Sequence, residues 1–222
     1  LTEEIDIIFL CNPNNPTGLL VEKPLLEKIL KRCQELNILM AVDECFLDFV
    51  PSPEKYTLKE YLETYDNLFL LKAFTKRYAM AGVRLGYGLC GNKGLLEKIE
   101  GVCQPWNVSS MAQAAGLAAL QEREYVEKGR QVTFQELAYL KEELAALGYP
   151  VYPSQANYVF FTGPADLYEK LEQKKILIRD CSNYTGLSKG YYRVAVKEHE
   201  ENQQLVRALK EIDRTKVENV IL

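Results

Sequence analysis

Residues 73–86 read AFTKRYAMAGVRLG, a stretch in which one lysine, Lys76, stands among small and apolar residues. Surface lysines usually have charged or polar neighbours. Apolar surroundings disfavour the charged ammonium and favour the free amine, which is a nucleophile. Taken alone, Lys76 fits better with a plainer interpretation, in which its stem lies along apolar surface and its amine reaches water. The segments on either side of it change that balance.

Upstream and downstream of Lys76, apolar runs alternate with one helical pattern. We predict strands at 5–10, 38–46, 67–74 and 83–90, and a helix at 23–37. This alternation is typical of an α/β fold with a mostly parallel sheet. Ligands of such sheets bind beyond the carboxyl ends of the strands. We therefore expect Asn15, Asp43 and Lys76 to converge on one crevice, although they are far apart in the sequence.

The second half of the chain has a different pattern. Residues 107–147 are helical in periodicity, and Gly148 is a suitable helix C-cap. Three strands are predicted after it, at 157–161, 175–180 and 191–196, with helices at 165–174 and 199–212. This is a small C-terminal α+β domain. We place the partial large domain at residues 1–130 and the small domain at 131–222.

The composition excludes several classes of protein. The chain has 222 residues, of which 47% are hydrophobic and 26% charged, and its net charge of -4 argues against a nucleic-acid binder. It contains no apolar run long enough to span a membrane. The N-terminus lacks the basic start of a signal peptide, so we expect a cytoplasmic protein. The six cysteines form no CxxC pair, which favours reduced thiols over a zinc site or a disulfide framework, and no metal is predicted.

The polar residues at the predicted strand ends suit an aldehyde cofactor such as pyridoxal phosphate. Lys76 would supply the amine that links to the aldehyde, and Asp43 would keep the pyridine nitrogen protonated. Thr75 and Arg84 would bind the phosphate. Asn15 would donate its amide to the ring oxygen.

NPNNPTG (12–18), AVDE (41–44) and FTKRYAMAGVRLGY (74–87) together resemble the class I/II aminotransferase group of fold-type I pyridoxal-phosphate enzymes, in both order and interval. The resemblance extends to about position 210. It implies the cofactor pyridoxal 5'-phosphate and the roles given above, with Lys76 and Asp43 catalytic. It also implies that Arg193 binds the substrate α-carboxylate. Two positions depart from the family pattern: Ala73 replaces a serine or glycine, and Phe46 replaces a tyrosine that donates to the ring oxygen.

Within the group, ILIRDCSNYTGLSKGYYRVAV (176–196) looks more like threonine-phosphate decarboxylases than like histidinol-phosphate aminotransferases. That resemblance implies decarboxylation of L-threonine O-3-phosphate to (R)-1-amino-2-propanol phosphate, which is used in cobalamin biosynthesis. A phosphate and a carboxylate on one small substrate need two cations, and we assign Arg179 and Arg193 to them. Asn157 is a third candidate for substrate binding. A surface role for Arg179 and a local loop hydrogen bond for Asn157 stay open.

Two alternatives remain at this point. The first is that the chain is a histidinol-phosphate-type aminotransferase. The second is that it is a truncated, cofactor-free and inactive remnant or an interaction module. Full-length relatives of the family carry a further N-terminal segment, which this chain is expected to lack. In the full-length form we expect a homodimer.

Overall fold

The computed structural model describes residues 1–220 and, among them, the side chains up to Asp213. The chain divides into two compact units. Unit 1 comprises Leu1–Asn14 and Leu20–Arg130, and unit 2 comprises Asn15–Leu19 and the residues from Gln131 onward. The sequence did not predict that Asn15–Leu19 belongs with the C-terminal unit.

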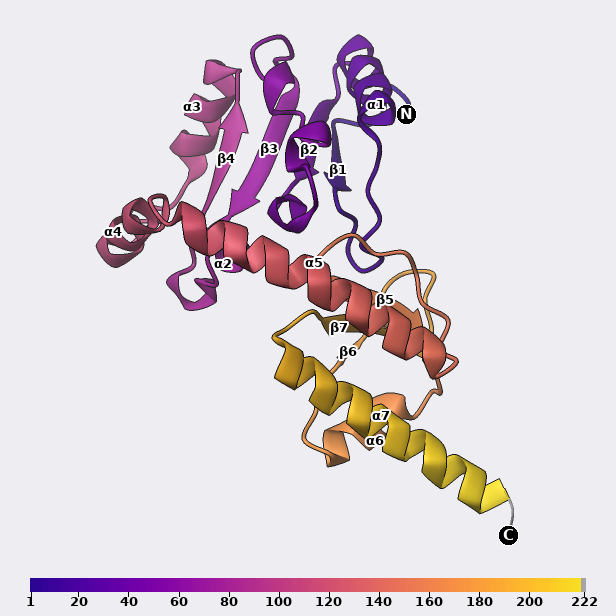
Figure 1. The fold of residues 1–222 in the computed structure, drawn as a ribbon. Helices are drawn as coiled ribbons and strands as arrows, with labels where there is room; N and C mark the ends of the chain where they lie inside the picture. The colour runs from indigo at the N-terminus through magenta and orange to yellow at the C-terminus, as the bar shows by residue number, and fades with distance from the viewer. Residues whose placement is uncertain (221–222) are drawn as a thin grey trace. The chain divides into compact units, whose positions relative to one another are not determined.

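Unit 1 is built on a four-stranded sheet (Figure 1). Its strands are β1 (Ile7–Cys11), β2 (Leu39–Asp43), β3 (Leu68–Ala73) and β4 (Gly86–Cys90). The order is β1-β2-β3-β4, with β1, β2 and β3 parallel and β4 antiparallel to β3. The expected α/β class with a mostly parallel sheet is confirmed.

The helices of unit 1 are α1 (Lys23–Glu35), α2 (Phe74–Arg77), α3 (Lys93–Val102) and α4 (Ser110–Ala119). Pro24 stands in the first turn of α1, where its missing N–H costs nothing. Asn92 and Ser109 cap α3 and α4 by accepting backbone N–H groups. Leucines of α1 pack on one face of the sheet and form the core of the unit. The buried members of this core are Leu26, Leu30, Cys33, Ile38, Met40, Val42, Leu58, Tyr65, Leu68 and Leu70.

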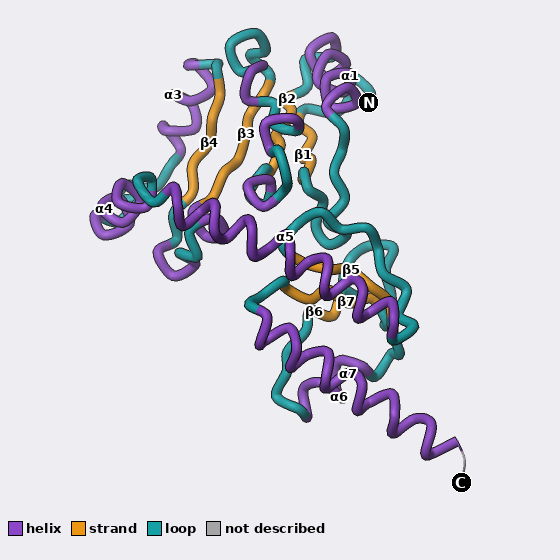
Figure 2. The backbone as a smooth tube through the Cα atoms, viewed as in Figure 1, coloured by secondary structure: helices purple, strands orange, loops and turns teal. Residues whose placement is uncertain are grey.

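Unit 2 contains a smaller antiparallel sheet, with the order β5-β7-β6 (Figure 2). Its strands are β5 (Tyr158–Thr162), β6 (Arg179–Asp180) and β7 (Tyr191–Ala195), and its helices are α6 (Leu167–Gln173) and α7 (His199–Val220). The long helix α5 (Arg123–Ala146) begins in unit 1 and continues into unit 2. Alternate residues of β5 and β7 pack against α5, α6 and α7 and form a second core.

Two predicted strands are shorter than expected, and for local reasons. The run at 175–180 forms a strand only at Arg179–Asp180, because Lys175 adopts a left-handed φ of 62° and Ile176 donates back to the Leu171 carbonyl. The apolar Ile176 and Ile178 pack on the core of unit 2 instead of pairing in the sheet. The run at 83–90 begins its strand at Gly86, because Arg84 has a φ of 58° and interrupts it.

The segment Asn15–Leu19 is packed closely on unit 2. The Gln155 amide donates to the Gly18 carbonyl at 2.8 Å. Gly18 has a φ of +71°, and a Cβ at this position would lie 1.8 Å from the Ser154 hydroxyl oxygen. Only glycine therefore fits at position 18 without displacing Ser154.

We expect Gly18→Ala to destabilise the protein more than Gly148→Ala does. Both glycines have a left-handed φ, so either alanine adds strain of about 1–2 kcal/mol. Nothing lies within 4 Å of a Cβ at Gly148, whereas the Cβ at Gly18 overlaps Ser154. The overlap should cost about 1–3 kcal/mol more. Free energies of unfolding from denaturant titration measure the difference, and equal losses in the two variants would contradict the packing of Gly18 on Ser154.

Candidate active site

In unit 1, the candidate residues meet at one edge of the sheet. Asp43 is the last residue of β2, and Lys76 lies in α2, directly after β3. Because β2 and β3 are parallel, their carboxyl ends lie at the same edge. Arg84 comes two residues before β4, and β4 pairs its first residue, Gly86, with Ala73. Asp43, Lys76 and Arg84 therefore emerge at the same edge of the sheet. Asn15, which the strand pattern grouped with Asp43 and Lys76, belongs to unit 2, so its convergence with them stays a prediction.

Lys76 is exposed in the structure, although the apolar residues around it in the sequence suggest a less exposed side chain. Its side chain lies at the surface, and its Nζ is 5.7 Å from the centre of the Phe46 ring. Ala79 has a φ of 53°, and the small residues after it, Ala81 and Gly82, are exposed. The small residues that follow Lys76 therefore do not bury it in this structure.

The carboxylate of Asp43 is held by the backbone that follows it. Its Oδ1 accepts a hydrogen bond from the Cys45 amide at 2.9 Å, which fixes the side chain relative to the end of β2. Burial, together with a smaller contribution from a hydrogen bond with Asp43, raises the pKa of the Cys45 thiol to about 12. The surroundings of Asp43 therefore contain a protonated thiol and no competing thiolate.

Two cations at this edge have no carboxylate partner among the side chains that the structure describes, those up to Asp213. Lys76 has only the ring of Phe46 beneath it, and Arg84 bonds only to the Ala81 carbonyl at 3.1 Å. Thr75 is half-buried in α2, between Phe74 and Lys76. An amine, a guanidinium and a hydroxyl at the same edge of the sheet as a fixed carboxylate fit a cofactor with an aldehyde, a phosphate and a basic ring nitrogen.

Sequence reasoning missed a buried ion pair beside Asp43. Glu44 is fully buried, and its Oε2 lies 2.9 Å from the Nζ of Lys72. The signal available in the sequence was the lysine that interrupts the apolar run of β3, FLLKAF (69–74).

In unit 2, Arg179 and Arg193 are directly opposite each other on the neighbouring strands β6 and β7. Opposed residues of an antiparallel pair point to the same face, and like charges in that position repel each other. Neither arginine forms an ion pair with a carboxylate among the described residues. The Arg179 guanidinium bonds to Asn183 at 2.8 Å, and the Arg193 guanidinium lies 5.0 Å from the centre of the Tyr158 ring. The face therefore carries two positive charges that are not neutralised.

Asn15 lies beside these arginines in unit 2. Its Oδ1 accepts hydrogen bonds from Arg193 and, at 3.4 Å, from the hydroxyl of Tyr184. Since both bonds use the amide oxygen, the Nδ2 group keeps its two N–H donors for another partner. This arrangement is compatible with Asn15 donating a hydrogen bond from its amide N–H group. Asn15 also orients the Arg193 guanidinium through the bond to Oδ1.

Asn157 stands apart from the two arginines. Its backbone carbonyl accepts a hydrogen bond from Val196, and its side-chain Oδ1 is buried with no hydrogen-bond partner in the part of the chain that the structure describes. A buried polar atom without a partner is costly, and its presence often marks a place where a ligand or water completes the bond. No hydrogen bond joins Asn157 to Arg179 or Arg193 within the described residues.

None of the helices within residues 1–220 is long and apolar enough to cross a membrane.

The profile of the family described as aminotransferase class I and II matches residues 1–209 of this chain. A threonine-phosphate decarboxylase from Salmonella typhimurium is 38% identical over 216 residues, which cover 96% of this chain and 59% of the relative. The crystal structure of a histidinol-phosphate aminotransferase from Clostridium acetobutylicum superimposes with a TM-score of 0.91 at 32% identity, covering 96% of this chain and 65% of that one.

A further solved structure, a histidinol-phosphate aminotransferase from Sinorhizobium meliloti, is a complex with pyridoxal-5'-phosphate. It shares the fold at a TM-score of 0.82 and 23% identity, and covers 94% of this chain and 57% of that one. The chain thus spans less than two thirds of the length of the proteins it matches. Since the family profile covers nearly all of its sequence, the chain belongs to the aminotransferase class I and II family of pyridoxal-phosphate-dependent enzymes.

Proposed function

We propose that this protein uses pyridoxal 5'-phosphate to decarboxylate L-threonine O-3-phosphate, giving (R)-1-amino-2-propanol phosphate. The observation that carries the proposal is the pairing of Arg179 with Arg193 across β6 and β7. Two guanidinium groups on one face of a sheet, without carboxylate partners, match a small substrate with two anionic groups. The similarity to the Salmonella typhimurium decarboxylase supports this choice of substrate.

The residues of unit 1 would bind the cofactor. When bound, pyridoxal phosphate supplies an electron sink for the bond that breaks at the substrate α-carbon. Lys76 provides the amine that holds the cofactor covalently, and Asp43 keeps a proton on its ring nitrogen. Arg84 and the hydroxyl of Thr75 bind its phosphate. The hydrogen bond from the Cys45 amide limits the rotation of the Asp43 carboxylate, which keeps an oxygen directed at one proton.

The residues of unit 2 would bind the substrate. Arg193 holds the α-carboxylate, and Asn15 orients its guanidinium through the hydrogen bond to Oδ1. The free N–H groups of Asn15 would donate to the ring oxygen of the cofactor. Arg179 holds the substrate phosphate, and Asn157 offers its unsatisfied Oδ1 to a donor on the substrate or on water. A cytoplasmic location and a homodimer of the full-length form stay predictions.

A second candidate function is a histidinol-phosphate-type aminotransferase, which the TM-score of 0.91 to the Clostridium acetobutylicum enzyme favours. Both reactions use the same cofactor residues, and they differ in the bond that breaks at the α-carbon. With cofactor and L-threonine O-3-phosphate present, we expect release of carbon dioxide and formation of an amino-propanol phosphate. Transfer of the amino group from histidinol phosphate to 2-oxoglutarate, without carbon dioxide, would decide for the aminotransferase.

Lys76→Ala should abolish the covalent cofactor adduct and leave the fold intact, because the exposed side chain contributes little to packing. The protein is incubated with pyridoxal phosphate, reduced with borohydride, digested and analysed by mass spectrometry. Lys98→Ala, a change on the exposed face of α3, serves as the matched control and should keep the adduct. An adduct on a different lysine in the unaltered protein would overturn the assignment, and no adduct at all would favour the cofactor-free alternative.

Arg179→Ala should weaken binding of L-threonine O-3-phosphate by about tenfold to a hundredfold, the scale of one charge-assisted hydrogen bond. Binding of unphosphorylated L-threonine should change little, because it lacks the group that Arg179 binds. Calorimetric titration of both compounds measures the two effects. Arg207→Ala, on the exposed surface of α7, should affect neither. Equal losses for both compounds would assign Arg179 to the carboxylate or to a structural role.

A further inference from the structure

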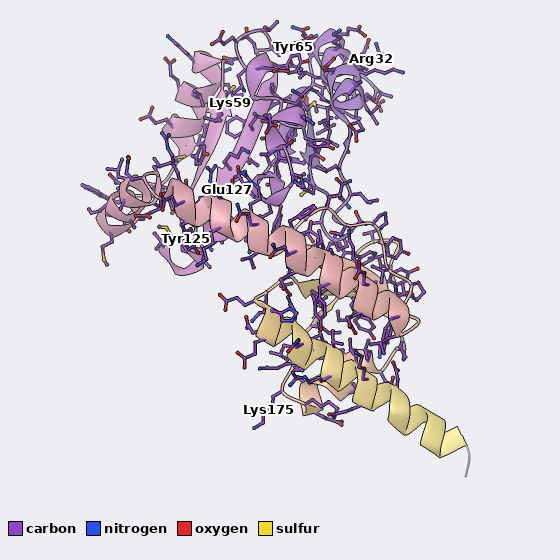
Figure 3. All side chains as sticks on the ribbon, viewed as in Figure 1. Arg32, Lys59, Tyr65, Tyr125, Glu127 and Lys175 are labelled. Carbon is purple, nitrogen blue, oxygen red and sulfur yellow. The ribbon has the colours of Figure 1, made fainter. Side chains whose placement is uncertain are left out.

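Glu44 follows Asp43 directly, and its carboxylate is completely buried. Its Oε1 accepts a hydrogen bond from the Leu58 amide at 3.1 Å, and its Oε2 accepts one from the Thr57 hydroxyl at 2.8 Å. Thr57 and Leu58 lie in the loop that leads to Lys59, which Figure 3 labels. Both oxygens of Glu44 are therefore bound, as a buried carboxylate requires.

Lys72 supplies the opposite charge. Its Nζ lies 2.9 Å from the Oε2 of Glu44, and the exposed fractions of the two side chains are 13% and 1%. In contrast, the Lys23–Glu60 pair has the same separation, but 62% of the Glu60 side chain is exposed. Solvent weakens such an open pair, whereas the Glu44–Lys72 pair is shielded from it.

The buried pair joins the two strands that carry the cofactor residues. Glu44 follows the end of β2, and Lys72 is the last residue but one of β3, four positions before Lys76. The register pairs Asp43 with Leu71, and the Glu44 amide donates to the Leu71 carbonyl at 3.0 Å. A side-chain ion pair and a backbone hydrogen bond thus fix the same two strand ends.

The pair also balances charge beside Asp43. Without Lys72, the buried carboxylate of Glu44 would stand next to the half-buried Asp43 in the sequence, with no cation to offset it. Leaving one member of a buried pair alone is far more costly than removing both. A role in holding geometry can therefore be separated from a role in stability by comparing single and double substitutions.

We propose that Glu44 and Lys72 are positioning residues that hold Asp43 and Lys76 at a fixed separation for the cofactor. This inference rests on the proposed cofactor site, but it makes a claim about the strand ends that can be measured without cofactor. The Glu44–Lys72 ion pair connects the carboxyl ends of β2 and β3. Its loss should therefore make these two strand ends more mobile and leave the rest of the sheet ordered.

The test is amide hydrogen exchange in the absence of cofactor. The Cys45 amide reports on Asp43, to which it donates, and the Glu44 amide reports on the contact with β3. The Met40 amide, which donates to Asn67 at 2.8 Å near the start of β2, is the internal reference. Glu44→Gln keeps an oxygen for Thr57 and Leu58 and should accelerate exchange at Cys45 and Glu44 by about tenfold or more, through local opening. Met40 should be unaffected, and Lys23→Met should change none of the three amides.

The double variant Glu44→Gln/Lys72→Met shows whether the ion pair holds the strand ends in position or only stabilises the folded protein. It should unfold at a higher temperature than Lys72→Met, because no buried charge is left unpaired. Exchange at Cys45 should nevertheless stay fast, and the borohydride-reduced adduct on Lys76 should fall severalfold at a limiting cofactor concentration. Protection of Cys45 in the double variant, or equal acceleration at Met40, would overturn the inference. If the unaltered protein forms no adduct with the cofactor, the proposed function is wrong. The hydrogen-exchange result alone then decides whether the Glu44–Lys72 pair holds the strand ends.

Discussion

Parallel pairing of β2 with β3 is the constraint on which the candidate site depends. Two parallel strands must end at the same edge of their sheet, so an acid at the end of one and an amine just beyond the other are neighbours in space. The sheet achieves this with residues that are far apart in the sequence. The register also decides which side chains share a face, and a slip of one residue would turn Asp43 to the opposite face.

Register has an equally direct effect in unit 2, where the pairing is antiparallel. The strand β6 has only two residues, yet its alignment with β7 sets Arg179 against Arg193. Two adjacent guanidinium groups are unfavourable for folding, since like charges on opposed residues repel each other. Such a local cost is typical of a place where binding of an anion later compensates it. Asn15 reduces the cost in part by accepting a hydrogen bond from Arg193.

Sequence reasoning located most of the strands, for which the signal is local. Apolar runs located β1, β2, β3, β5 and β7, because such runs bury a strand whatever else the chain does. It failed where backbone geometry or tertiary contacts decided the outcome. The left-handed conformations of Arg84 and Lys175 coincide with the two strands that are shorter than predicted. The partnership of Glu44 with Lys72 depends on a register that composition does not reveal.

The five residues Asn15–Leu19 give the chain an unusual connectivity. Their membership in unit 2 means that the polypeptide passes between the units three times, after Asn14, after Leu19 and after Arg130. A fragment that starts at Gln131 would contain both arginines but would lack Asn15 as well as the glycine that packs on Ser154. No single cut yields the complete second unit. Recombination between relatives at residue 130 would therefore join the segment Asn15–Leu19 from one parent to the sheet of unit 2 from the other, and the two would have to match at Gly18 and Ser154.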